Sequence, residues 1–85
     1  MIDAKTAYKI FRREHPDRKV FSMCDYSKKY YVITASNENG SIDFNGSEYA
    51  IDKKNGEISV YNPLEDIGYF MKVSYERKID ISSFK

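Results

Sequence analysis

The sequence predicts one α+β domain over residues 1–85, in which an N-terminal helix, an antiparallel sheet of about four strands and a C-terminal helix follow one another. Three observations indicate this. Apolar residues recur at helical spacing near the N-terminus, alternate with polar residues through the middle of the chain, and return to helical spacing after residue 62. Because a lone sheet must bury its apolar side against another layer, we expect both helices on one sheet face. The opposite face would be solvated or would meet a partner.

The first helix is predicted over residues 3–15. Its apolar positions fall at i, i+3, i+4 and i+7, with basic residues on the remaining arc: Ala4, Ala7, Tyr8 and Phe11. Asp3 can cap the N-terminus with a side-chain oxygen. Pro16 biases His15 away from helical geometry and so ends the helix.

Two strands are predicted next, in residues 20–26 and 30–33, because their apolar residues follow a period of two. The short polar stretch 25–29 between them fits a hairpin loop and therefore antiparallel pairing. Residues 36–47 are rich in turn-forming residues and should be the longest loop.

A second hairpin is predicted for residues 48–52 and 57–61, around Asn55-Gly56. Asn-Gly supplies the positive φ angles of a tight turn. The inward side chains should be Tyr49, Ile51, Ile58 and Val60.

The second helix is predicted over residues 63–72. Asn62 can cap it, with a proline at the first helical position and a glutamate at the third. It should end before Val73-Ser74-Tyr75, which favours a strand.

The composition argues against nucleic acid and membranes as partners. Charged residues make up 32% of the chain but the net charge is +1, which removes the basic field that drives nucleic-acid binding. Cys24 is the only cysteine, so no intramolecular disulfide is possible and a cytoplasmic setting is expected. No segment approaches the roughly 18 apolar residues of a membrane span, and no signal-peptide pattern is seen at residues 1–5, so neither a membrane partner nor export is expected.

No catalytic, cofactor or metal site is predicted, and the chain is not expected to be an enzyme. His15 suits a helix C-terminus electrostatically, and Cys24 lacks the spacing of a zinc ligand or a nucleophile. The carboxylates Glu48, Asp52 and Glu57 near the second hairpin could pair as acid and base, but solvated charges are the usual reading.

A calcium site is not expected either. Asp43, Asn45 and Ser47 alternate as oxygen ligands could, yet the segment lacks the length and the later glutamate of an EF-hand loop. Turn chemistry explains these residues better.

Tyrosine is unusually frequent, at eight residues with no tryptophan. Tyrosine suits protein interfaces because its apolar ring ends in a polar group. Strand parity directs Asp52, Glu57, Ser59 and Tyr61 away from the predicted core. One of Tyr30 and Tyr31 must face the same way, and Tyr30 joins this set if the register of its strand allows. The predicted partner-binding site is therefore Tyr30, Asp52, Glu57, Ser59 and Tyr61. Replacing Tyr61 by alanine should then weaken the binding of a partner protein and leave the fold intact.

The arrangement over residues 3–71, above all the hairpin 49–58, resembles two families. One is the YrhB-type immunity proteins of bacterial toxin systems, and the other is the PepSY domain of peptidase propeptides. The chain departs from the first by having Tyr30-Tyr31 where a tryptophan is often found, and from the second by lacking a secretion signal. Both resemblances imply a binding or inhibitory module.

The predicted function is therefore a protein-binding module, such as an immunity or inhibitor protein that binds a toxin or a host protein. A small phage-encoded or accessory protein is one alternative. A small hydrolase is the other, with Asp25 beside Cys24 as the nearest approach to a catalytic pair.

Overall fold

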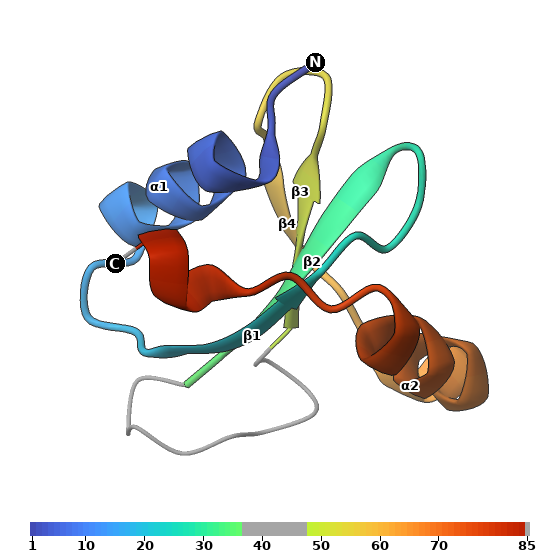
Figure 1. Ribbon diagram of the computed structural model, residues 1–85. Helices are drawn as coiled ribbons and strands as arrows, with labels where there is room; N and C mark the ends of the chain where they lie inside the picture. The colour runs from blue at the N-terminus through green and yellow to red at the C-terminus, as the bar shows by residue number, and fades with distance from the viewer. Residues whose placement is uncertain (37–47, 85) are drawn as a thin grey trace.

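The computed structural model describes residues 1–36 and 48–84 and confirms the α+β class (Figure 1). The expected loop 36–47, except for Ser36, and the residues Asp43, Asn45 and Ser47 lie outside the described part. The elements in chain order are α1 (Ala4–Glu14), β1 (Val20–Cys24), β2 (Tyr30–Ala35), β3 (Glu48–Asp52), β4 (Ile58–Val60), the 3-10 helix η1 (Pro63–Asp66), α2 (Ile67–Glu76) and the 3-10 helix η2 (Ile81–Phe84).

The first helix begins and ends as its sequence predicts. Asp3 Oδ1 accepts a hydrogen bond from the Thr6 amide at 2.8 Å. Hydrogen bonds from the Thr6 side chain and from this amide hold the pKa of the Asp3 carboxyl below its ordinary value. At the other end His15 leaves helical geometry, and its amide donates to the Phe11 carbonyl at 2.8 Å. The apolar stripe of α1 buries Ala7, Tyr8 and Phe11.

The four strands form an antiparallel sheet in the order β1-β2-β3-β4, as expected for two hairpins. Met23 lies opposite Ile33, Ile33 opposite Tyr49, and Tyr49 opposite Val60, so these side chains share one face. In the second hairpin only Gly56 has a positive φ, at 77°. Asn55 does not, which corrects the expectation of two positive φ angles in this turn.

The two helices lie on opposite faces of the sheet, which corrects the prediction that they share one. The α1 face buries Met23, Tyr31, Ile33 and Ile51 against Phe11. The α2 face buries Cys24 and Val32 against Phe70 and Val73. Since Val32 and Ile33 are neighbours in one strand, they must point to opposite faces, and each meets a different helix (Figure 1).

The second helix differs from its predicted bounds. Residues 63–66 form a 3-10 turn, and α2 continues to Glu76, through the stretch 73–75 that favours a strand. Val73 is 5% exposed and packs into the α2 face, so burial outweighs its weak β preference. None of the described helices combines the length and the apolar character needed to cross a membrane.

The chain after α2 covers the outer edge of β1. The Asp25 amide donates to the Arg77 carbonyl at 3.0 Å, and the Ile79 amide donates to the Met23 carbonyl at 2.9 Å. Lys78 forms a bridge with Cys24. The segment then turns into η2, where the Phe84 ring packs 5.6 Å from the Tyr8 ring.

Candidate binding surface at strand β4

The two side chains considered for catalysis, His15 and Cys24, pack against other side chains of the fold. The His15 ring lies between Phe11 and Tyr49, with ring centroids 5.0 and 5.3 Å away. Cys24 is 2% exposed, and burial raises the pKa of its thiol to about 11. Within residues 1–36 and 48–84, no group of three or more histidine, cysteine, aspartate or glutamate residues is placed to hold a metal ion.

The carboxylates near the second hairpin are separated by the register of the sheet. Glu48 and Asp52 lie at the two ends of β3, and Glu48 is buried. Asp52 Oδ1 accepts a hydrogen bond from the Lys54 amide at 2.7 Å, which closes the turn. Glu57 is exposed beside that turn.

Asp25 belongs to a partly buried ion-pair network. The Lys53 ammonium bonds to its carboxylate and sits 4.6 Å from the Tyr31 ring centroid. The Arg77 guanidinium approaches the same carboxylate at 3.6 Å. These contacts join the first hairpin loop to the second hairpin turn and to the end of α2.

The predicted partner-binding residues do share the α2 face by register, but they do not form one patch. Tyr30 lies opposite Asp52, whereas the Tyr61 amide bonds to the carbonyl of Glu48 at the other end of β3. Tyr30 is half-buried with the Lys29 ammonium 5.2 Å from its ring centroid. Partner binding by Tyr30, Asp52, Glu57, Ser59 and Tyr61 stays a prediction.

Tyr61 is not on a free surface, because α2 packs against it. Its ring lies 5.6 Å from the Phe70 ring and 5.1 Å from the Tyr26 ring, and the two tyrosine hydroxyls are 2.8 Å apart. Burial and this hydrogen bond raise the pKa of the Tyr61 phenol. The helix that covers it was expected on the other face.

The outer edge of β4 is open as far as residues 1–36 and 48–84 are concerned. The Asp52 amide donates to the Glu57 carbonyl and the Tyr61 amide to the Glu48 carbonyl, each at 2.9 Å. Since main-chain groups alternate in an antiparallel pair, the amides and carbonyls of Ile58 and Val60 point away from β3. No residue of the described chain bonds to them.

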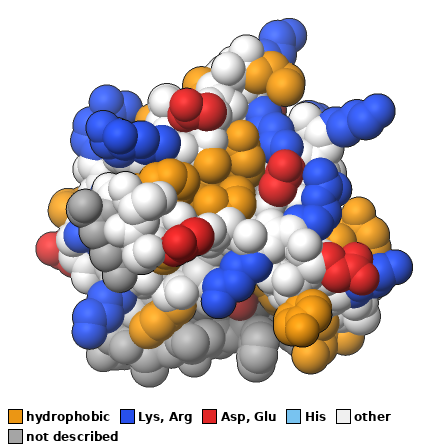
Figure 2. All heavy atoms as spheres, viewed as in Figure 1, with side chains coloured by type: hydrophobic (Ala, Val, Ile, Leu, Met, Phe, Trp, Pro, Cys, Tyr) orange, Lys and Arg blue, Asp and Glu red, His pale blue; other side chains and the backbone are white. Residues whose placement is uncertain are grey.

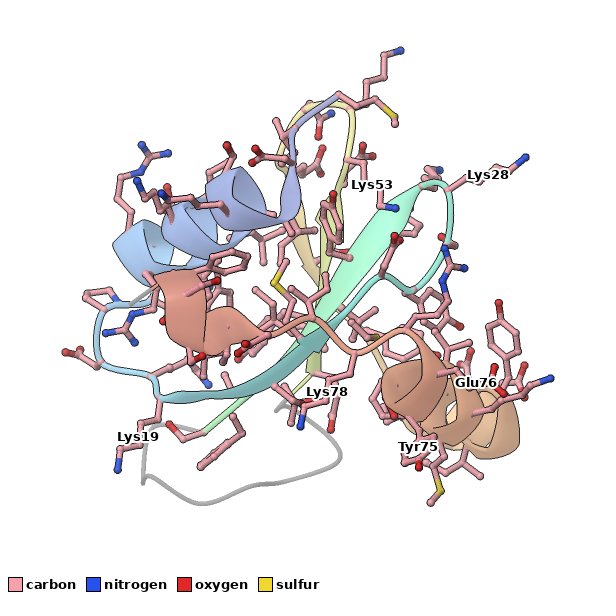
Figure 3. All side chains as sticks on the ribbon, in the orientation of Figure 1. Lys19, Lys28, Lys53, Tyr75, Glu76 and Lys78 are labelled. Carbon is pink, nitrogen blue, oxygen red and sulfur yellow. The ribbon has the colours of Figure 1, made fainter. Side chains whose placement is uncertain are left out.

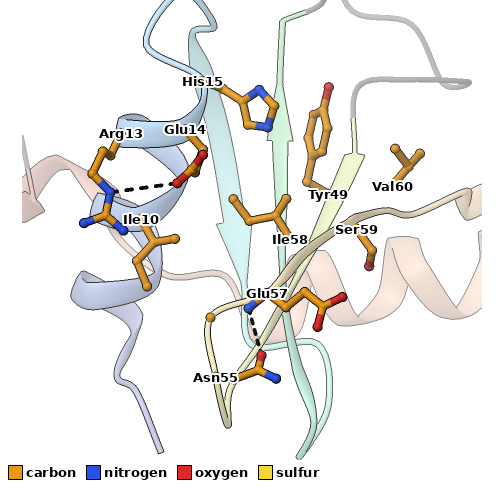
Figure 4. Close-up of a pocket in the computed structure, with 11 residues that line it drawn as sticks. Ile10, Arg13, Glu14, His15, Tyr49, Asn55, Glu57, Ile58, Ser59 and Val60 are labelled. Atoms are coloured by element: carbon orange, nitrogen blue, oxygen red, sulfur yellow. Dashed lines mark hydrogen bonds and ion pairs between the residues drawn. The ribbon is translucent and has the colours of Figure 1, made fainter.

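A groove of about 550 Å³ runs beside this edge, between β4 and α1 (Figure 4). Apolar side chains line it from both sides: Ile10 from α1, and Tyr49, Ile58 and Val60 from the sheet. Val60 is 67% exposed there, although its side chain points to the core face. Arg13 and Glu14 border the groove on the helix side, and Glu57 borders it on the strand side.

The sequence reasoning missed this surface although it identified the strand. Ile58 and Val60 were assigned to the core, and that side-chain direction is right for both. Val60 is exposed because β4 is the last strand of the sheet, whereas Ile58 is half-buried against the core. The sequence predicts a longer strand, 57–61, and the three-residue length of β4, which is typical of an edge strand, is seen only in the structure.

The resemblance of the hairpin 49–58 to YrhB-type immunity proteins and PepSY domains stays a prediction. Its turn follows from local chemistry, since Gly56 is needed for the positive φ and Asn55 Oδ1 accepts the Glu57 amide at 2.9 Å. Compared with known proteins, the chain matches no protein-family model, no curated protein sequence and no solved structure.

Proposed function

We propose that this chain is a non-catalytic protein-binding module that takes up an extended segment of a partner protein along the open edge of β4. The observation that carries this proposal is the pair of residues Ile58 and Val60, whose main-chain groups point outward beside an apolar groove. Addition of a strand to a sheet edge is a recurring mode of peptide recognition. An inhibitor or immunity protein would use such a surface to cover a segment of the protein that it blocks.

The hydrogen bonds offered by the edge set the length and the strength of the contact. Ile58 and Val60 each present one amide and one carbonyl, which pair with alternate residues of an added strand. Each such bond contributes about 1 kcal/mol net, because it replaces bonds to water. Main-chain pairing alone therefore gives weak binding, and side chains in the groove must add to it.

The groove indicates which side chains the partner segment carries. Successive residues of an added strand point to opposite faces, so every second side chain enters the groove and meets Ile10 and Ile58. Those positions should be apolar. The intervening side chains lie beside Ser59, which is exposed, and should be polar. The expected ligand is a short extended segment that alternates apolar and polar residues.

A proline substitution tests the edge directly. Val60→Pro removes an amide that β3 does not use, and proline is tolerated on edge strands for that reason. Val60→Ala is the matched control, since it shortens the same side chain and keeps the amide. Peptides from a displayed library, selected on the unmodified protein, should bind Val60→Pro about fivefold more weakly, as expected for the loss of one main-chain hydrogen bond, and Val60→Ala much less so.

Amide hydrogen exchange shows where a selected peptide binds. In the free protein the amides of Ile58 and Val60 should exchange quickly, and that of Ser59, which faces β3, should exchange slowly. Peptide binding should slow exchange at Ile58 and Val60. Protection that appears elsewhere, or equal binding by the proline and alanine variants, would refute the proposal.

A further inference from the structure

Another cavity, of about 450 Å³, lies between α1, the start of β1 and η2, and it shares no lining residue with the groove at β4. Three cationic side chains line it together with apolar and aromatic ones: Lys9, Arg12, Lys19, Tyr8, Val20 and Phe84, here called the basic cavity. Lys19 lies on the α1 side of the molecule, away from α2 (Figure 3). Among the described residues no carboxylate lines this cavity. It therefore combines positive charge with an apolar wall.

The three cations of the basic cavity have no partner of opposite charge in the described part of the chain. None of its carboxylates forms an ion pair with Lys9, Arg12 or Lys19. Arg12 Nη1 donates a hydrogen bond to the Arg18 carbonyl, which holds the guanidinium in place and uses only one of its nitrogens. Lys9 and Arg12 are three residues apart on α1, where like charges repel. An anion in the cavity would relieve this repulsion.

Tyr8 contributes a hydroxyl group to the same cavity. The residue is buried, at 7% exposed, yet its hydroxyl forms no hydrogen bond to any residue that the structure describes. Buried polar groups normally have a hydrogen-bond partner. An oxygen atom of a ligand in the basic cavity would accept a hydrogen bond from this hydroxyl.

Phe84 and Val20 form the apolar wall of the cavity, and both are half-buried. The Phe84 ring is tilted by 53° against the Tyr8 ring, with 5.6 Å between the two centroids. A flat ring of a ligand can pack against such an aromatic side chain. The lining residues thus favour a ligand with two parts, an anionic group and a ring.

The basic residues are concentrated in the first part of the chain. Six of the 14 basic residues lie within residues 1–20, together with three of the 13 acidic ones. In Figure 2 basic side chains gather over α1. Since the net charge of the whole chain is +1, residues 21–85 are net negative and would repel a long polyanion. The cavity therefore favours a small anion.

We infer that the basic cavity binds a small organic phosphate monoester whose organic part carries a flat ring. The phosphate group lies among Lys9, Arg12 and Lys19 and accepts a hydrogen bond from the Tyr8 hydroxyl, while the ring packs against Phe84. A phosphate monoester carries about 1.5 to 2 negative charges near pH 7 and has three acceptor oxygens, so it can contact several cations at once. This site is independent of partner binding at β4.

Titration with phenyl phosphate, followed by the amide signals in proton–nitrogen NMR spectra, tests the inference. The probe joins one phosphate monoester to one flat ring. The signals of Lys9, Lys19 and Phe84 should shift. Inorganic phosphate lacks the ring and should bind about fivefold more weakly, and phenol lacks the phosphate and should leave these signals in place.

Variants show which groups hold the probe. The double variant Lys9→Gln, Lys19→Gln should bind phenyl phosphate about tenfold more weakly, since it removes two exposed cations. Lys28→Gln, Lys54→Gln is the matched control: it removes the same charge from two exposed lysines in the hairpin turns and should bind as the unmodified chain does.

Tyr8→Phe removes only the hydroxyl and keeps the ring. It should weaken phenyl phosphate about fivefold through the lost hydrogen bond, and thermal unfolding should show no loss of stability, because the hydroxyl has no partner in the described chain. Unshifted signals, equal affinities for phenyl phosphate and inorganic phosphate, or equal binding by the two double variants would each overturn the inference. Tighter binding by a phosphotyrosine peptide than by phenyl phosphate would overturn the assignment to a small molecule.

Discussion

Replacing Gly56 by alanine should destabilise the protein by about 2 kcal/mol, and the two contributions can be separated. Gly56 has a φ of 77°, where a residue with a Cβ pays about 1 kcal/mol or more. The new Cβ would also lie 2.7 Å from Ile10 Cδ1, well inside ordinary contact. Because that atom is the end of a flexible, half-buried side chain, Ile10 can turn away at a cost of about 0.5–1 kcal/mol.

Urea unfolding followed by circular dichroism measures the loss, and the melting temperature should fall by about 10 °C. Gly68→Ala is the matched control, because Gly68 has no positive φ and an added Cβ there meets no atom within 4 Å. That variant should gain up to about 0.5 kcal/mol from the better helix propensity of alanine. Equal unfolding free energies for Gly56→Ala and Gly68→Ala would refute the reasoning.

A double-mutant cycle isolates the contact between the turn and α1. Ile10→Val removes Cδ1, the atom that the new Cβ would meet, and leaves φ of residue 56 unchanged. In the Ile10→Val background the loss caused by Gly56→Ala should shrink to the backbone part, about 1 kcal/mol. An unchanged loss would show that the backbone angle accounts for the whole effect.

Three further predictions follow from buried groups. Lys53→Met should lower the free energy of unfolding in urea by about 1–2 kcal/mol, because it removes the ammonium group that bonds to Asp25. The loss is limited because Asp25 is partly exposed and keeps its contact with Arg77. An unchanged free energy of unfolding would mean that the ion pair contributes nothing. Burial raises the pKa of the Cys24 thiol from 9.0 to about 11, so the folded state disfavours the thiolate and the unfolding free energy should fall between pH 9 and pH 11, less so in Cys24→Ala; identical pH profiles would contradict this. Tyr61→Phe should cost about 1 kcal/mol through the lost hydrogen bond to Tyr26, and Tyr61→Ala about 2 kcal/mol through lost packing, in contrast to the expectation from the sequence that the fold stays intact; thermal unfolding of the two variants checks both values.

The elements with local signals could be predicted from the sequence. Asp3 caps α1 and Pro16 follows its end, and both signals act within a few residues of the boundary that they set. The hairpin of β3 and β4 follows from Gly56 and the alternation around it. Strand parity also placed Tyr61 on the face opposite Tyr49 correctly, but it left open which of Tyr30 and Tyr31 shares that face, and the register of the sheet decides for Tyr30.

What could not be predicted depends on contacts between distant residues. The chain that leaves β4 crosses to the face opposite α1, and nothing within residues 61–66 alone fixes that side. Burial of Val73 against Cys24 and Val32 then extends α2 beyond Lys72. The open edge at Ile58 and Val60 depends likewise on the order of the strands in the sheet, which the hydrophobic periodicity of the sequence does not specify.

The segment that covers β1 has a consequence for assembly. A sheet with one free edge can pair with one other chain, so two chains can join edge to edge and growth then stops. A sheet with two free edges can pair with a chain on each side and can therefore add chains without limit. The Ile79 amide closes the β1 edge through its bond to the Met23 carbonyl. Ile79→Pro removes that bond. The variant should form elongated aggregates, visible by light scattering, whereas the unmodified protein should form none. Residues 77–79 thereby prevent the addition of further strands at the β1 edge of the sheet.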